Sequence, residues 1–204
     1  MNSHLLMIAL LAAPSQRGGA DTFDAAKPGA TINGWHCGLT GSGNPRWVIE
    51  VDPTAPTKPN VLKQVGEGDF PWCVMSGPSF ADGFVETHLK LVSGQEDQAG
   101  GVIWRFKDTD NYALARANAS EGNVTVFEVV KGRRRAIKSI DLEVSAKTWH
   151  TLRVEVSGQQ VTVYFNGKRV IDTSETQVHG SGGVGVWTKA ESVTAFDCFS
   201  AGPK

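Results

Sequence analysis

The stretch WHTLRVEVSGQQVTVYFNGKRVI, residues 149–171, decides the fold class. Its first eight residues alternate, so that one face of an extended chain would carry His150, Leu152, Val154 and Val156. A second apolar run, VTVYF, follows a short polar segment, and the dipeptide Asn166-Gly167 separates it from a third run. Both residues of that dipeptide accept the positive φ angles of a two-residue hairpin turn. The stretch therefore predicts antiparallel strands that each have one solvated face.

The same alternation recurs through most of the chain, and no window shows the spacing of three and four residues that marks an amphipathic helix. Lys131 and Gly132 predict a second hairpin, whereas the three prolines within residues 51–60 predict a surface loop or an edge segment. We expect strands over residues 47–51, 84–92, 101–106, 112–118, 124–130, 149–156, 161–165, 183–188 and 193–200. The pattern predicts an all-β sandwich of two packed antiparallel sheets.

Length and charge limit the organisation and the partners of the chain. Its 204 residues fit a single domain, which we place at residues 21–204. Twenty Lys and Arg residues nearly balance 21 Asp and Glu residues, which gives no electrostatic reason to expect nucleic acid as a partner. Residues 1–20 hold a short apolar run, residues 5–13, followed by small residues, which is typical of a cleaved signal peptide. The run is too short to span a membrane, so we expect a secreted or periplasmic protein without membrane insertion. The alternative interpretation of residues 5–13 is a buried strand.

Three cysteines, Cys37, Cys73 and Cys198, leave room for one internal disulfide and one free thiol. The sequence does not indicate which pair would be bridged, and three buried thiols that pack as small apolar side chains are an equal alternative. No spacing of Cys and His residues matches a structural zinc site. We expect no cofactor, although a structural calcium ion is compatible with the fold class.

A group of polar residues on two expected strands and their turns is the first candidate for a ligand site. Planar amide, carboxylate and guanidinium groups suit sugar hydroxyls or a carboxylate. The alternative is that the Asp and Asn residues only build turns and that Arg116 pairs with Glu121 for structural reasons. The candidate ligand-binding residues of this group are Arg105, Asn111, Tyr112, Arg116, Asn118, Glu121 and Asn123.

Six tryptophans offer flat rings on which a sugar could stack, and most are expected to fill the core. Trp187 lies beside glycines that would allow a ligand to approach, so it is the first candidate for an exposed platform. Trp104 is the second candidate. Both are added to the predicted ligand-binding residues.

Catalytic residues are harder to find. Retaining glucanases need two carboxylates that flank the scissile bond, and no E-x-D-x-x-E motif is present. Glu86 and His88 are expected on the polar face of one strand, where they could act as acid or base. They are the only catalytic candidates, and ordinary strand surface is the alternative interpretation.

Four segments carry a resemblance to a known family: WVIEVDPTAPTKPNVLKQ, DQAGGVIWRFKDTDNYALARANASEGNVTVFEV, WHTLRVEV and GGVGVWTKAESVTAFDCFS. They resemble secreted bacterial domains of the 3-keto-disaccharide hydrolase-like group, formerly a domain of unknown function. That group is similar in fold to concanavalin A-like lectins, glucanases and laminin G domains. The resemblance implies a jelly-roll sandwich with one concave sheet and an association with carbohydrate. Two departures are Ala113 after Tyr112, which removes an aromatic platform, and Cys198, which replaces an acidic residue that could hold a cation.

Three functions remain open after these observations. The first is a secreted carbohydrate-binding domain that holds a glycan on its concave sheet. The second is a hydrolase or lyase acting on 3-keto-disaccharides, with Glu86 or His88 as the base and an arginine that stabilises an enolate. The third is a structural or adhesive, laminin G-like module that binds a protein partner.

Overall fold

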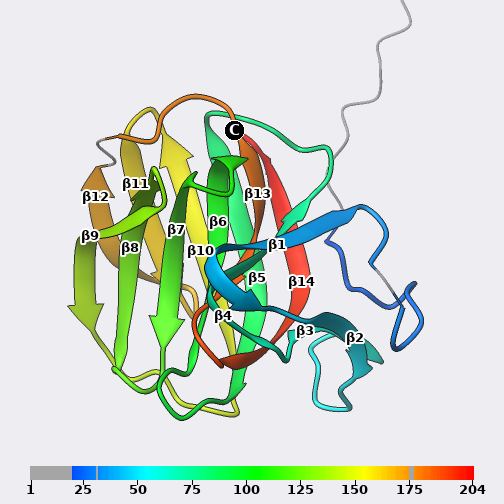
Figure 1. The fold of residues 1–204 in the computed structure, drawn as a ribbon. Coiled ribbons are helices and arrows are strands. Elements are labelled where there is room, and N and C mark those ends of the chain that lie inside the picture. Colours follow the sequence, from blue (N-terminus) through cyan, green and yellow to red (C-terminus); the bar gives the residue numbers. More distant parts are fainter. Residues whose placement is uncertain (1–19, 31, 175–176) are drawn as a thin grey trace, which may run out of the picture.

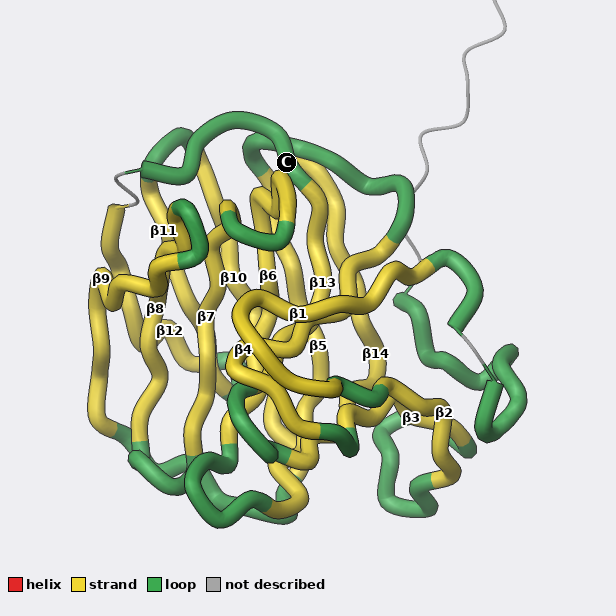
Figure 2. The backbone as a smooth tube through the Cα atoms, viewed as in Figure 1, coloured by secondary structure: helices red, strands yellow, loops and turns green. Residues whose placement is uncertain are grey.

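The computed structural model describes residues 20–30, 32–174 and 177–204, and in that part of the chain it contains strands and loops only (Figure 2). The predicted signal peptide lies outside the described residues, apart from Ala20. Since the described residues form no helix, they offer no helical segment long and apolar enough to cross a membrane.

Two seven-stranded antiparallel sheets pack against each other, which confirms the predicted jelly-roll sandwich (Figure 1). Sheet I has the order β1 (Trp35–Asn44), β4 (Glu67–Met75), β13 (Gly183–Thr188), β6 (Ala99–Asp108), β7 (Asn111–Asn118), β8 (Asn123–Val130) and β9 (Arg133–Asp141). Sheet II has the order β12 (Lys168–Ser174), β11 (Gln160–Phe165), β10 (Trp149–Ser157), β5 (Gly83–Ser93), β14 (Val193–Pro203), β3 (Asn60–Gln64) and β2 (Trp47–Val51).

The local turn chemistry of the sequence is realised as predicted. Asn166 and Gly167 join β11 to β12 with φ angles of 51° and 76°. Lys131 and Gly132 join β8 to β9 with φ angles of 51° and 72°. The proline-containing segment forms the loop between β2 and β3. Asn166 and the two glycines readily adopt this left-handed conformation, because glycine lacks a Cβ and asparagine tolerates positive φ.

The main core lies between the two sheets. On β10 every second residue from His150 to Val156 is buried, and on β5 Val85, Leu89 and Leu91 face the same core, as the alternation predicted. On β7 the three alanines 113, 115 and 117 are fully buried in this core. Their small side chains allow sheet II to approach β7 closely.

A second apolar cluster lies on the other side of sheet I. It contains Tyr112 and Leu114, which alternate along β7 with the three core alanines, so its members point away from sheet II. We call this surface the outer face of sheet I. Sheet I is thus apolar on both faces, which is unusual for an antiparallel sheet with a solvated side.

The pairing of β1 with β4 shows which two cysteines are bridged. Cys37 and Cys73 are opposite each other in this pair and form a disulfide, while Cys198 is a free, half-buried thiol. Burial, together with the nearby Asp197 carboxylate, raises the pKa of the Cys198 thiol. The Cys198 thiol is therefore not activated as a nucleophile.

Candidate functional site

The outer face of sheet I is an aromatic floor. Its second apolar cluster consists of Trp72, Val74, Ile103, Tyr112, Leu114, Phe127, Val129 and Trp187, with Phe70 and Phe106 packed against it. The Phe70 and Trp187 rings stack with centroids 5.8 Å apart, and the rings of Trp72 and Phe106 lie 4.8 Å apart. Strands β4, β13, β6, β7 and β8 all contribute to the floor.

Arg134 shows that this face is curved into a trough. The Arg134 Cζ lies 4.6 Å from the ring centroid of Phe70 on β4 and 4.5 Å from that of Phe127 on β8. The two centroids are therefore at most about 9 Å apart, whereas four strand spacings in a flat sheet would separate β4 from β8 by about 19 Å. Sheet I must curl, and both rings must lean inward. The predicted concave sheet is thus sheet I.

A polar cluster stands on one wall of the trough. Arg116, only 3% exposed, donates to both carboxylate oxygens of Glu121, at 3.3 and 2.6 Å, and to Asn123 Oδ1 at 2.7 Å. Asn123 Nδ2 in turn donates to Glu121 at 3.0 Å. Burial raises the pKa of the Glu121 carboxyl, but the hydrogen bonds from Arg116 and Asn123 outweigh it and hold this pKa below its usual range. The Glu121 carboxylate stays ionised and 43% exposed, so it can still accept from a ligand.

Asp97 forms a second polar node beside the first. Its carboxylate accepts from Asn118 Nδ2 at 2.6 Å and from the Lys189 ammonium group, with which it forms an ion pair. Asn118 Oδ1 accepts from the backbone amides of residues 120 and 121 and so fixes the loop that presents Glu121. The node therefore positions the polar cluster.

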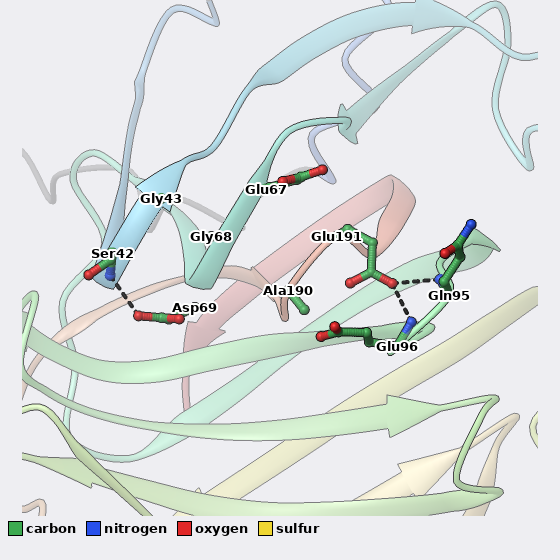
Figure 3. A pocket seen from close by; sticks show the side chains of 9 residues that line it. All are labelled: Ser42, Gly43, Glu67, Gly68, Asp69, Gln95, Glu96, Ala190 and Glu191. Carbon is green, nitrogen blue, oxygen red and sulfur yellow. Dashed lines mark hydrogen bonds between the residues drawn. The ribbon is translucent and has the colours of Figure 1, made fainter.

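A depression of about 450 Å³ opens at the same end of the trough (Figure 3). It is lined by residues 42–43, 67–69, 95–96 and 190–191, which directly adjoin Phe70, Asp97 and Lys189 in the chain. Glu191 Oε1 accepts from the backbone amides of Gln95 and Glu96, each at 2.5 Å, and Asp69 accepts from the amide of residue 42 at 2.7 Å. These contacts join the β13–β14 loop to the β5–β6 loop, and β4 to β1, around an acidic hollow.

The structure brings together four of the residues predicted to bind a ligand. Arg116, Asn118, Glu121 and Asn123 lie at one end of β7 and β8, within one network of hydrogen bonds. The structural interpretation of the Arg116 and Glu121 pair is confirmed, and the pair also leaves a carboxylate exposed at the trough. Ligand binding by this group stays a prediction.

Other members of the predicted group lie elsewhere. Arg105 has a φ of 51° and donates to the carbonyl oxygens of residues 81, 158 and 178, so it ties loops together at the opposite end of β6. Asn111 belongs to the turn between β6 and β7, where its side chain bonds to Asp108 and to the amide of residue 131. Tyr112 is fully buried in the floor, and its hydroxyl bonds to Thr40 at 3.0 Å. Burial raises the pKa of this phenol.

The expectation of exposed tryptophan platforms is wrong for both candidates. Trp104 is 1% exposed and belongs to the core between the sheets. Trp187 does lie on the outer face, but it is fully buried, because Phe70 stacks on it and the Arg134 guanidinium lies 5.5 Å from its ring. Neither ring offers a flat surface to a sugar.

The catalytic candidates lie on the outer face of the other sheet. Glu86 and His88 alternate with buried residues along β5 in sheet II, as predicted, and point away from the core. The arginine that pairs with Glu86 is Arg153 on β10, at 3.5 Å. Neither residue shares a surface with the Arg116 cluster, and the arginine beside the candidate base Glu86 is therefore Arg153. A catalytic role for Glu86 or His88 stays a prediction.

Residues missed by the sequence analysis complete the trough: Phe70, Asp97, Phe127, Arg134 and Lys189. The alternation of Phe127 and Val129 on β8, and the pairing of Val129 with Arg134 across the predicted hairpin, were the available signals. Among the described residues no group of three or more His, Cys, Asp or Glu side chains is arranged to hold a metal ion. A structural calcium ion stays a prediction.

Comparisons with known proteins agree with this architecture. The model of a family described as the galactocerebrosidase C-terminal lectin domain matches residues 96–202, just over half of the chain. The levanase of Bacillus subtilis strain 168 is 25% identical over 124 residues, which are 60% of this chain but only 18% of the levanase.

Solved structures at lower identity share the fold. The carbohydrate-binding module CBM66 from Bacillus subtilis aligns with a TM-score of 0.65 at 20% identity, covering 82% of this chain and 94% of the module. The cellulose-induced protein Cip1 aligns with the same TM-score at 11% identity, covering 91% of this chain and 97% of Cip1. The resemblances to the 3-keto-disaccharide hydrolase-like group and to laminin G domains stay predictions.

Proposed function

The chain belongs to the family of the galactocerebrosidase C-terminal lectin domain, and from that premise we propose that it is a carbohydrate-binding module whose glycan lies in the trough of sheet I. The names of the levanase and of the CBM66 module support this proposal, because both refer to carbohydrate. Levan, the polymer in the levanase's name, is a first polysaccharide to test.

One observation carries the proposal: the Arg116, Glu121 and Asn123 network presents an exposed carboxylate beside a curved aromatic floor. Sugars are recognised by planar hydrogen-bonding groups that take hydroxyls in fixed directions, next to apolar surface. Arg116 holds Glu121 in one orientation through two hydrogen bonds, at 2.6 and 3.3 Å, so little side-chain entropy remains to be lost on binding. The depression beyond Asp97 gives a glycan room to continue.

The mode of binding differs from the predicted one. Because Trp104 and Trp187 are buried, the sugar is held by polar groups and the edges of the floor instead of by an exposed tryptophan platform. Phe70, which is only partly buried, is the ring placed to contact an apolar sugar face.

The test is binding of the purified domain to levan and to a panel of plant and microbial polysaccharides by affinity electrophoresis and calorimetry. Glu121→Gln and Asn123→Ala should weaken binding by about tenfold each, since each loses one directed hydrogen bond. Glu155→Gln, on the outer face of sheet II, is the matched control and should bind like the wild type. Equal weakening in the control, or binding unaffected by both trough variants, would refute the location.

Catalysis on 3-keto-disaccharides is the second candidate function, because Glu86 on the outer face of sheet II lies 3.5 Å from the Arg153 guanidinium. Incubation with plain and 3-keto disaccharides tests it directly, and release of product that is abolished by Glu86→Gln would favour the enzyme over the binding module. A protein partner for a laminin G-like surface would become the better proposal if no glycan binds.

Export of the protein is a further part of the proposal. The Cys37–Cys73 disulfide supports an oxidising compartment, because such bonds persist in secreted and periplasmic proteins. The apolar N-terminal run supports the same interpretation. Fractionation of the producing cells, with sequencing of the mature N-terminus, tests both.

A further inference from the structure

Arg134 is a cation in the centre of the trough, and within the described part of the chain it forms no ion pair. Its guanidinium group lies among the rings of Phe70, Phe127 and Trp187, at 4.6, 4.5 and 5.5 Å. Its NH1 nitrogen is buried and has no hydrogen-bond acceptor among the described residues. Aromatic faces attract a cation, but they do not replace hydrogen bonds to its N–H groups. The group is therefore held in position with an unused donor.

The charges around Arg134 do not neutralise it. Arg116 is paired with Glu121 at 2.6 Å, and Lys189 is paired with Asp97. Burial, and then the positive charge of Arg116, hold the pKa of Arg134 below its usual range despite the opposing effect of Asp97. Among these five charged groups, namely Arg134 and the two ion pairs, one positive charge is thus left over. A bound anion next to the partly buried Arg134 side chain would stabilise its charge.

We propose that the trough selects an acidic sugar. This sugar is a uronic acid residue whose carboxylate is bound by Arg134 and whose hydroxyls form hydrogen bonds with Glu121 and Asn123. This inference rests on the proposed carbohydrate-binding function and names the ligand class. A guanidinium group matches the two oxygens of a carboxylate better than it matches a single hydroxyl. A second unused donor, the buried Nε of Arg116, lies on the same face.

The neighbouring depression limits the ligand to one acidic residue at this point. Its lining includes the carboxylates of Glu67, Asp69, Glu96 and Glu191, and it opens next to the Asp97 node. A second uronate placed there would meet like charges, whereas the hydroxyls of a neutral sugar would find acceptors. The ligand is therefore a uronic acid joined to a neutral sugar and not a continuous polyuronate.

The test compares three disaccharides that differ only at C6 of the terminal residue: glucuronic acid linked to a neutral hexose, its methyl ester, and the corresponding neutral disaccharide. Calorimetry and NMR titration of the full chain should show the acid binding at least about tenfold more tightly than the ester, because the ester keeps the shape but loses the charge. This preference should shrink as the salt concentration rises.

Variants at two neighbouring arginines of β9 test whether Arg134 causes the preference for the acid over the ester. Arg134→Gln should remove this preference. Arg134→Lys should keep part of it, since the positive charge remains but the pair of parallel hydrogen bonds from a guanidinium group is lost. Arg133→Gln is the matched control, because Arg133 is exposed and its side chain points to the opposite face of the strand from Arg134. Circular dichroism melts of all three variants report whether each has folded.

Three results would overturn the inference. These are equal affinity for the acid and its ester in the wild type, a preference that survives in Arg134→Gln, and a preference that disappears equally in Arg133→Gln. Suppose that neutral glycans bind, that Glu121→Gln lowers their affinity, and that the carboxylate of the ligand makes no difference. The uronate assignment then fails, and the proposed carbohydrate-binding function stands. If the acid and all neutral glycans fail to bind, both fail.

Discussion

The Arg116 and Glu121 pair yields a prediction that joins stability to pH. Glu121→Gln removes the negative charge but keeps one acceptor oxygen for Arg116, whose side chain is 3% exposed. A hydrogen bond to a charged group contributes about 1.5–3 kcal/mol. Because Glu121 is 43% exposed and the glutamine still accepts one bond, we expect a loss of about 1 kcal/mol in the free energy of unfolding at neutral pH. That loss corresponds to a fall of about 3 °C in Tm.

The effect must depend on pH in one direction. Hydrogen bonds from Arg116 and Asn123, against the opposing effect of burial, lower the pKa of Glu121 from its reference value of 4.5. A carboxyl whose pKa is depressed in the folded state contributes its stability above the unfolded pKa, and this contribution disappears as the pH falls through the folded pKa. The difference between wild type and Glu121→Gln should therefore be complete above pH 4.5 and should vanish in more acidic solution.

Urea titrations at a series of pH values from neutral to strongly acidic measure this difference directly. Glu155→Gln is the control, because Glu155 pairs with Arg153 at 2.9 Å where both side chains are about 30% exposed, and it should change stability by no more than about 0.5 kcal/mol. A Glu121→Gln penalty that is the same at every pH, or that is no larger than the control's, would refute the account of this pair.

Three further predictions concern the packing under the aromatic floor, the disulfide and the outer face of sheet II. Gly38→Ala should lower stability by about 1–3 kcal/mol in denaturant titrations, because the new Cβ would lie 2.6 Å from two ring carbons of Trp72, and a variant as stable as the wild type would show that the floor can yield. Replacing Cys37 and Cys73 together by alanine should lower the free energy of unfolding by about 2–5 kcal/mol, which calorimetric melting would detect, and no change in Tm would contradict a role for the bridge. Glu86→Gln should leave glycan affinity unchanged in the same binding assays, and a measurable loss would place part of the ligand on sheet II.

The sequence was sufficient for elements whose cause is local. Alternation along residues 149–156 determined which side of β10 is buried, and Asn166-Gly167 determined a hairpin, because both effects act within one strand or one turn. Part of the site was local as well. Arg116, Glu121 and Asn123 lie within eight residues on two strands joined by a tight turn, so they meet whatever the rest of the fold does.

Only the tertiary structure decided which apolar face is the core and what covers the other. Trp104 and Trp187 both sit in alternating strands, and since sheet I is apolar on both sides, the pattern alone could not separate the tryptophan between the sheets from the one in the trough. Arg134 meets Phe70 only because the curvature of sheet I brings together β9, at one edge of the sheet, and β4, next to the other edge. Strand order and curvature depend on contacts across the whole chain, and no local rule of turn or alternation contains them.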